Sequence, residues 1–139
     1  MIQRMSFGSI FVRDQDVAID FYVNKLGFEL TRDQTLPHGF RWVTVRPKGQ
    51  TELQIILFKP AVGKKLGEED VAHIYDLMAK GAFGAGVFET ADCRRTFEEL
   101  TGRGVEFLSP PKEQFYGIEA VFKDNSGNWF SMTQPKQWQ

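Results

Sequence analysis

The most constraining feature of this 139-residue chain is an internal repeat, because its second half matches its first half at an offset of 76 or 77 residues. The matched pairs that carry the repeat are Val12 with Phe88, Asp16 with Asp92, Phe21 with Phe97, Gly27 with Gly104 and Glu29 with Glu106. A period this long, repeated twice, predicts two copies of one small module rather than a solenoid or a propeller. Ligands tend to bind where such units meet, so the repeat also bears on function.

Each half of the chain predicts the same βαβββ order of elements. In the first half, alternation predicts strands over 6–12, 28–31, 40–45 and 52–58. A helix should lie between the first two strands, with Asp14 at its N-cap and its end near Gly27.

In the second half, the expected strands are 83–88, 105–108, 117–123 and 128–134. Thr90 or Asp92 caps the expected helix, Gly104 ends it, and residues 67–80 carry a further helical face. We therefore expect one α+β domain over residues 1–139: a first βαβββ module at 4–60, a linker helix within 61–81 and a second βαβββ module at 82–135.

Composition excludes several classes of function. The formal net charge is −1 and the basic residues are scattered, which is unlike a nucleic-acid-binding surface. Cys93 is the single cysteine, so no intrachain disulfide can form and a reducing compartment is favoured. The chain has no apolar run of membrane-spanning length and no signal-peptide pattern. We expect a soluble cytoplasmic protein with no nucleic-acid or membrane partner.

Alternation along the strands predicts two faces of different character. One is apolar and should lie under helices: Ile10, Val12, Val43, Val45, Leu53, Ile55, Leu57, Ala85, Val87, Ile118, Ala120, Phe122, Phe130 and Met132. The other, which includes Phe88, mixes rings, small residues and isolated polar groups, as a small-molecule cleft does. The ligand-binding residues expected on it are Phe7, Ser9, Phe40, Trp42, Gln54, Gly84, Glu119, Trp129 and Ser131.

Two segments resemble a known family. The stretch from Val12 to Glu29 resembles the opening of the vicinal oxygen chelate superfamily, which holds glyoxalase I, the bleomycin-resistance proteins and the extradiol dioxygenases. The run Asp-Asn-Ser-Gly-Asn at 124–128 is similar to the family's Asp-Pro-Asp-Gly-Asn turn. The resemblance implies two βαβββ modules whose sheets curve around one central cleft, usually in a homodimer.

The resemblance also implies four positions that hold a divalent metal in the family's metalloenzymes. They map onto Phe7, Gln54, Gly84 and Ser131. Only Gln54 could act as the family's ligands do, because phenylalanine and glycine offer no donor atom and a serine hydroxyl is a poor ligand for a transition metal. We expect no metal and no other cofactor.

These observations favour a metal-free protein that binds a hydrophobic or aromatic small molecule. An enzymatic alternative stays open: a glyoxalase-related lyase or isomerase, with or without a metal, that uses Glu119 as general acid or base beside Trp42 and Trp129. Glu119 could equally be solvated near the rim or paired with Arg41 or Arg46.

Overall fold

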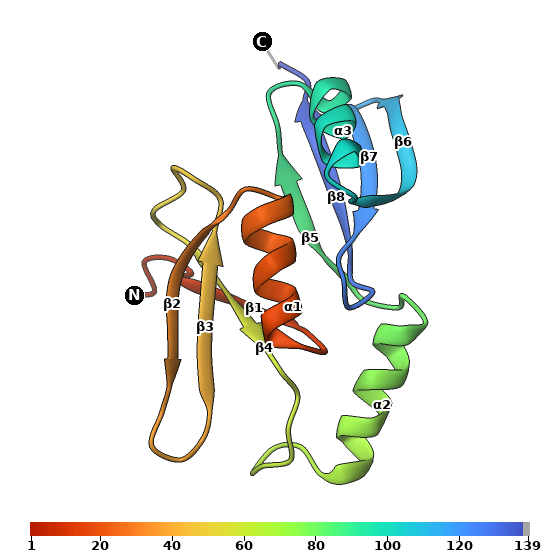
Figure 1. Cartoon of the computed structure of the whole chain (residues 1–139). Helices are drawn as coiled ribbons and strands as arrows, with labels where there is room; N and C mark the ends of the chain where they lie inside the picture. Colours follow the sequence, from red (N-terminus) through yellow and green to blue (C-terminus); the bar gives the residue numbers. More distant parts are fainter. Residues whose placement is uncertain (138–139) are drawn as a thin grey trace. The chain divides into compact units, whose positions relative to one another are not determined.

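The computed structural model describes residues 1–137, and it contains two compact units that match the two halves of the repeat (Figure 1). The first unit is Met1–Tyr75 and the second begins at Asp76. Each unit holds one four-stranded sheet with helical structure against one face. The predicted α+β class with two βαβββ modules is confirmed.

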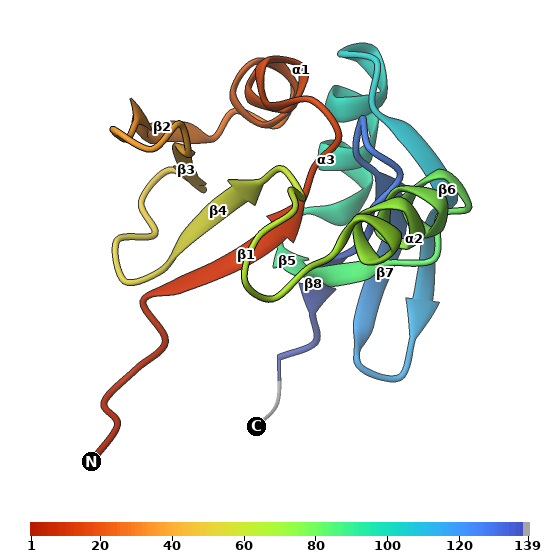
Figure 2. The same ribbon diagram turned by 90° about the horizontal axis from the view of Figure 1, so that it is seen from below.

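The first unit is built from β1 (Phe7–Phe11), α1 (Gln15–Ile19), the π-helix η1 (Asp20–Lys25), β2 (Glu29–Thr35), β3 (Arg41–Arg46) and β4 (Gln54–Phe58). Its sheet order is β1-β4-β3-β2, in which β1 runs parallel to β4 and the other neighbours are antiparallel. In Figure 2, α1 lies on one side of this sheet. The other face, which we call the helix-free face, presents alternate residues of each strand.

The sequence predicted one helix in the first unit, but the structure divides this segment into α1 and η1. Asp14 caps it as expected, because its side chain accepts a hydrogen bond from the backbone N–H of Val17 at 3.0 Å. After Ile19 the backbone widens into η1, and the N–H of Leu26 bonds to the carbonyl of Phe21. The neighbouring rings of Phe21 and Tyr22 are both buried there.

The helix α2 (Glu68–Ala79) spans the boundary between the units, where the sequence predicted a linker helix. The second unit continues with β5 (Gly84–Glu89), α3 (Cys93–Gly102), β6 (Glu106–Gln114), β7 (Gly117–Lys123) and β8 (Trp129–Pro135). Its sheet order, β5-β8-β7-β6, repeats that of the first unit. Asp92 rather than Thr90 caps α3, through the backbone N–H of Arg95. Within residues 1–137, no helix is both long and apolar enough to cross a membrane.

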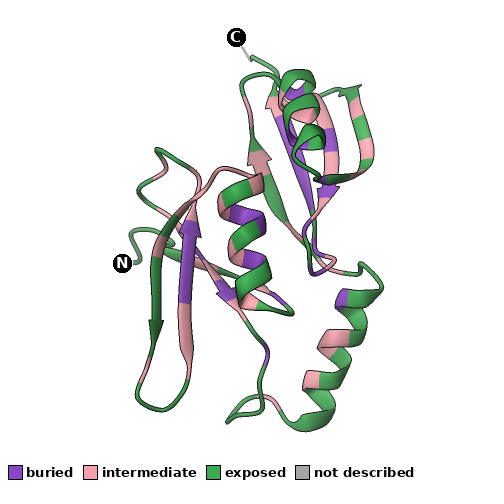
Figure 3. Ribbon diagram, in the orientation of Figure 1, coloured by how far each residue is buried: buried purple, intermediate pink, exposed green. Residues whose placement is uncertain are grey.

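Burial confirms most of the predicted core and corrects one strand. Figure 3 shows buried residues along β3 and β8 and on the helical segment of the first unit. Val87 was predicted to be core, but it is 68% exposed, whereas the ring of Phe88 stacks on Phe130 with a centroid distance of 4.8 Å. The register of β5 against β8 shifts between Gly84 and Gly86, and this bulge reverses which residues of β5 face the helix.

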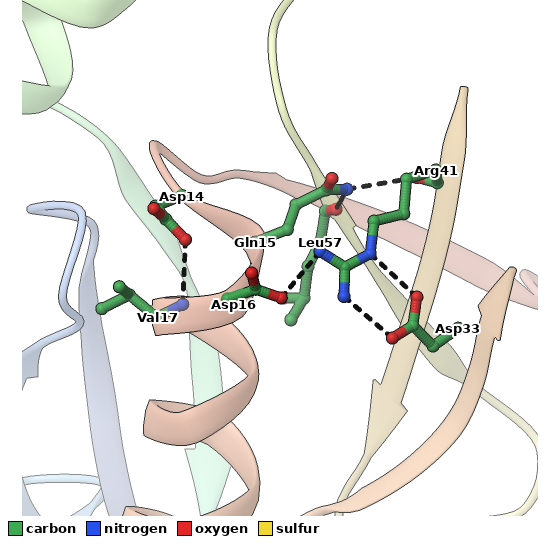
Figure 4. A network of polar contacts seen from close by, with 7 residues as sticks. All are labelled: Asp14, Gln15, Asp16, Val17, Asp33, Arg41 and Leu57. Carbon is green, nitrogen blue, oxygen red and sulfur yellow. Dashed lines mark hydrogen bonds and ion pairs between the residues drawn. The ribbon is translucent and has the colours of Figure 1, made fainter. Parts of the chain in front are cut away.

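An arginine joins the start of α1 to the edge of the first sheet (Figure 4). Arg41 forms two hydrogen bonds of 2.9 Å with the carboxylate of Asp33 and one of 2.8 Å with Asp16. The hydrogen bond from Arg41 lowers the pKa of Asp33, and its positive charge acts in the same direction. The amide of Gln15 also donates to the backbone carbonyls of Arg41 and Leu57.

The turn between β7 and β8 is held by a buried carboxylate. Asp124 accepts hydrogen bonds from the backbone N–H groups of Ser126 and Asn128 and from the side-chain amide of Asn128. Gly127 has a φ of 101° in this turn, and a Cβ there would lie 2.2 Å from the carbonyl oxygen of Met78. The turn therefore packs directly on the end of α2.

This packing predicts a difference between two glycines with similar backbone angles. Gly49 has a φ of 87°, and a Cβ at that position would meet no atom within 4 Å. Gly49→Ala should lower the free energy of unfolding by about 1 kcal/mol through backbone strain alone. Gly127→Ala adds a steric clash with the backbone of Met78 and should cost about 3 kcal/mol or more. Denaturant unfolding of both variants measures the difference, and equal losses would contradict the close approach.

Candidate ligand-binding site

A cavity of about 640 Å³ lies on the helix-free face of the first sheet. Three of the predicted ligand-binding residues line it from neighbouring strands: Phe7 of β1, Trp42 of β3 and Gln54 of β4. Phe7 and Gln54 are direct partners in the pairing of β1 with β4, so their side chains emerge side by side. The rings of Phe7 and Trp42 meet edge to face, with centroids 5.7 Å apart. This volume falls within the usual range for small-molecule sites.

A β-bulge in β2 forms one wall of this cavity. Leu30 pairs with Val45 and Arg32 pairs with Thr44, which leaves Thr31 as the extra residue between them. A bulge bends its strand and redirects the side chain at that point. The result is that Glu29, Leu30, Thr31 and Arg32 all line the cavity, although they are consecutive in sequence.

Three polar side chains form a hydrogen-bonded cluster in the cavity lining. The hydroxyl oxygen of Thr31 lies 2.6 Å from that of Thr44 and 2.7 Å from Oε1 of Gln54. Thr44 is fully buried, and its hydroxyl is satisfied by this contact. The cluster therefore gives the cavity a hydrogen-bonding patch beside the rings of Phe7 and Trp42.

The other predicted residues of the first unit lie outside the cavity lining. Phe40 precedes β3 and contacts the rings of Trp42 and Phe58, with centroid distances of 6.3 Å and 5.7 Å. Ser9 of β1 is exposed and pairs with Ile56. Phe40 thus contacts Trp42 without lining the cavity, while Ser9 lies two residues after Phe7 on the same face of β1.

In the second unit, Trp129 and Gly84 are in direct contact. A Cβ at Gly84 would lie 2.4 Å from the indole of Trp129, so the ring covers the backbone at this position. Trp129 remains 39% exposed. In the pairing of β5 with β8, Gly84 is opposite Trp129 and Val87 is opposite Ser131.

Glu119 and Ser131 are brought together in a hydroxyl–carboxylate network on the same sheet. Tyr116 donates to Oε1 of Glu119 at 2.6 Å, Ser131 donates to Oε2 at 2.5 Å, and Ser131 also contacts Thr133. The hydrogen bond to Glu119 raises the pKa of the Tyr116 phenol, with a smaller contribution from desolvation. The two arginines named as possible partners of Glu119 form ion pairs within their own unit, Arg41 with Asp33 and Arg46 with Glu29.

The four positions that hold a metal elsewhere in the family do not fit a metal ion in this chain. The side chains of Phe7 and Gly84 offer no donor atom, and the space beside Gly84 is filled by the indole of Trp129. The hydroxyl of Ser131 is committed to Glu119, and Oε1 of Gln54 to Thr31. Among residues 1–137, no three His, Cys, Asp or Glu residues are placed together to hold a metal.

The sequence prediction missed several residues of the cavity: Glu29, Leu30, Thr31, Arg32, Thr44 and Arg46. Thr44 alternates with Val43 and Val45, which were predicted to be core, so it could have been chosen from alternation alone. The residues of β2 could not, because the expected strand ended at Thr31 whereas β2 extends to Thr35 and contains the bulge. A second hollow of about 630 Å³ lies at the ends of β7 and β8, and no predicted site residue lines it.

The network around Glu119 predicts an unusual titration of Tyr116. A raised pKa means that the neutral phenol is stabilised in the folded protein, so this contribution is present below the ordinary pKa of about 10 and is lost as the pH rises through the folded value. In a pH titration, the phenolate absorbance of the wild type minus that of Tyr116→Phe reports Tyr116 alone. Its midpoint should therefore lie at a pH above about 10. The same difference measured in a Glu119→Ala background should have its midpoint near the ordinary value. An identical midpoint in both backgrounds would contradict the assignment.

Comparison with known proteins agrees with this architecture. The model of the Glyoxalase/Bleomycin resistance protein/Dioxygenase superfamily matches residues 4–132. The chain is 44% identical to UcmS2, with a TM-score of 0.90 and coverage of 96% of this chain and 99% of that one. It is 30% identical to TnmS3, an antibiotic binding protein from Streptomyces sp. CB03234, with a TM-score of 0.77 and coverage of 97% and 98%.

A relative from Bacillus subtilis, YetH, is 30% identical over 134 residues, which are 96% of this chain and 100% of YetH. The family match covers nearly the whole chain and agrees with the paired βαβββ modules. The resemblance noted in the sequence is therefore confirmed, and the chain belongs to the Glyoxalase/Bleomycin resistance protein/Dioxygenase superfamily.

Proposed function

We propose that this protein binds a small, hydrophobic, partly aromatic molecule and holds it without a metal ion and without converting it. The observation that carries the proposal is the cavity of about 640 Å³, in which the rings of Phe7 and Trp42 lie beside the polar cluster of Thr31, Thr44 and Gln54. The lining places three apolar side chains, Phe7, Leu30 and Trp42, among polar and charged ones. Rings beside polar groups at fixed positions are a feature of small-molecule sites. The similarity to TnmS3, an antibiotic binding protein, supports the same class of function.

The aromatic lining supplies the affinity in this proposal. Phe7 is 40% exposed, so a ligand that covers it removes apolar surface from water. A ligand ring on Trp42 or Phe7 would add roughly 0.5–1.5 kcal/mol beyond the area term. Phe40 keeps the indole of Trp42 in place through its own ring contact.

The second unit contributes candidate residues on its own sheet. Trp129 offers an exposed indole, and Glu119 and Ser131 offer a fixed polar group that Tyr116 holds in place. Both oxygens of Glu119 already accept hydrogen bonds from hydroxyl groups, so we assign this carboxylate a place in the binding surface rather than a catalytic role.

We also propose a homodimer. Each sheet has two edge strands, β1 and β2 in the first unit and β5 and β6 in the second. Edge strands leave backbone groups available for pairing, and closed symmetric dimers are the commonest way in which soluble chains associate.

The first test of this proposal is the role of Trp42. Trp42→Ala should weaken the binding of 2-acetonaphthone, a small aromatic probe, by about ten-fold, because the ligand loses a ring partner and buried apolar area. Isothermal titration calorimetry measures the affinity, and the thermal midpoint is recorded for each variant. Phe115→Ala is the matched control, since that ring is 82% exposed and lies outside the cavity. Equal losses of affinity in the two variants would show that the probe does not bind in this cavity.

The second test concerns the state of the purified protein. Native mass spectrometry should give a dimer of two 15.9 kDa chains with no added mass of a divalent metal. The reason is the donor set, in which one of the four family positions carries a side chain that the family uses as a ligand. A monomer mass would contradict the dimer, and one metal per chain that is lost in Gln54→Ala would contradict the metal-free assignment.

A further inference from the structure

The hydrogen bonds of the polar cluster in the first cavity have a direction. Two oxygens that can only accept lie within reach of the Thr31 hydroxyl: Oε1 of Gln54 at 2.7 Å and the backbone carbonyl oxygen of Thr44 at 3.0 Å. We place its single proton on the shorter contact, to Oε1 of Gln54. The contact of 2.6 Å between the hydroxyls of Thr31 and Thr44 is then donated by Thr44. The chain of donors therefore runs from Thr44 to Thr31 to Gln54.

This direction leaves the amide nitrogen of Gln54 as the donor at the end of the chain. Among residues 1–137, Nε2 of Gln54 donates to no protein acceptor, and no fully buried side-chain nitrogen or oxygen lacks a partner. The Nε2 atom is therefore accessible, and Gln54 lines the cavity. A ligand oxygen that accepts a hydrogen bond is the group that this end of the chain can recognise.

The charged residues of the cavity lining also favour a ligand that carries an electron-rich oxygen. Arg46 is paired with Glu29 at 3.0 Å, whereas Arg32 forms no ion pair within the described part of the chain. The cavity lining thus carries two arginines and one carboxylate, an excess of one positive charge. An excess positive charge favours electron-rich or anionic ligands and disfavours cations.

We propose that this cavity selects flat aromatic ligands that carry a carbonyl or carboxylate oxygen, with that oxygen on Nε2 of Gln54 and the ring against Trp42 and Phe7. The inference rests on the proposed binding function and adds the chemical class of the ligand. It also states a selectivity: a cationic aromatic ligand of the same size binds less tightly. The polar groups supply this discrimination because a donor left without a partner in a bound complex weakens binding.

Four naphthalene probes of matched size test the selectivity by isothermal titration calorimetry at neutral pH. They are 2-acetonaphthone, 2-naphthoate, 2-methylnaphthalene and 2-naphthylmethylammonium. The wild type should bind the first two about ten-fold more tightly than the last two, since one satisfied hydrogen bond at a sheltered site changes affinity by about that factor.

Gln54→Glu is the decisive variant because it keeps the side-chain size and an oxygen that accepts from Thr31, but it replaces the donor with a carboxylate oxygen. The affinities for 2-acetonaphthone and 2-naphthoate should fall about ten-fold, and that for 2-naphthylmethylammonium should rise. Gln50→Glu, in the turn after β3, makes the same change of charge outside the cavity lining and should alter none of the four affinities by more than about two-fold. If Gln54→Glu lowers the thermal midpoint, Gln54→Leu carries the test, with loss of preference for the acceptor probes expected.

The outcomes separate this inference from the function on which it rests. If all four probes bind the wild type with equal affinity, or if Gln54→Glu weakens all of them equally, the acceptor selectivity is wrong and aromatic binding stands. If none of the four probes binds, both the binding function and the selectivity are wrong.

Discussion

The structure depends on one constraint, which is that each four-stranded sheet buries a single face under its own helix. In the first unit α1 and η1 bury the side that carries Val43, Val45 and Leu57. In the second unit Phe107, Phe122 and Phe130 form the corresponding core with Phe97 of α3. The opposite faces do not pack under a helix and need not be uniformly apolar, so they can carry rings, hydroxyls and amides together.

Bulges then decide which residues these faces present. In β2 the bulge at Thr31 brings a hydroxyl to Thr44 and Gln54, and it lets neighbouring residues line one cavity. In β5 the shift between Gly84 and Gly86 sends Val87 outward and Phe88 inward. The two units follow one plan in their strand order but differ at these points, and the differences give each face its own chemistry.

The positions that hold metals elsewhere in the superfamily carry other interactions in this chain. Gly84 admits the indole of Trp129, Ser131 binds the carboxylate of Glu119, and Gln54 accepts from Thr31. The fold is shared with the superfamily, whereas the side chains at these positions serve packing and hydrogen bonding in this chain. This is the physical basis for proposing a binding protein within a superfamily that also contains metalloenzymes.

The sequence alone determined the fold class, because the repeat, the alternation of apolar residues and the cap at Asp14 are local signals that survive in any context. Strict alternation also placed Phe7, Trp42 and Gln54 together on the face that carries the cavity. Tertiary structure decided the rest. A bulge shifts the side-chain period without a sequence mark, so the role of Thr31 and the outward position of Val87 became clear only from strand pairing. The partners of Glu119 depended on which hydroxyls the folded sheet brought within reach, and no spacing in the chain specifies that distance.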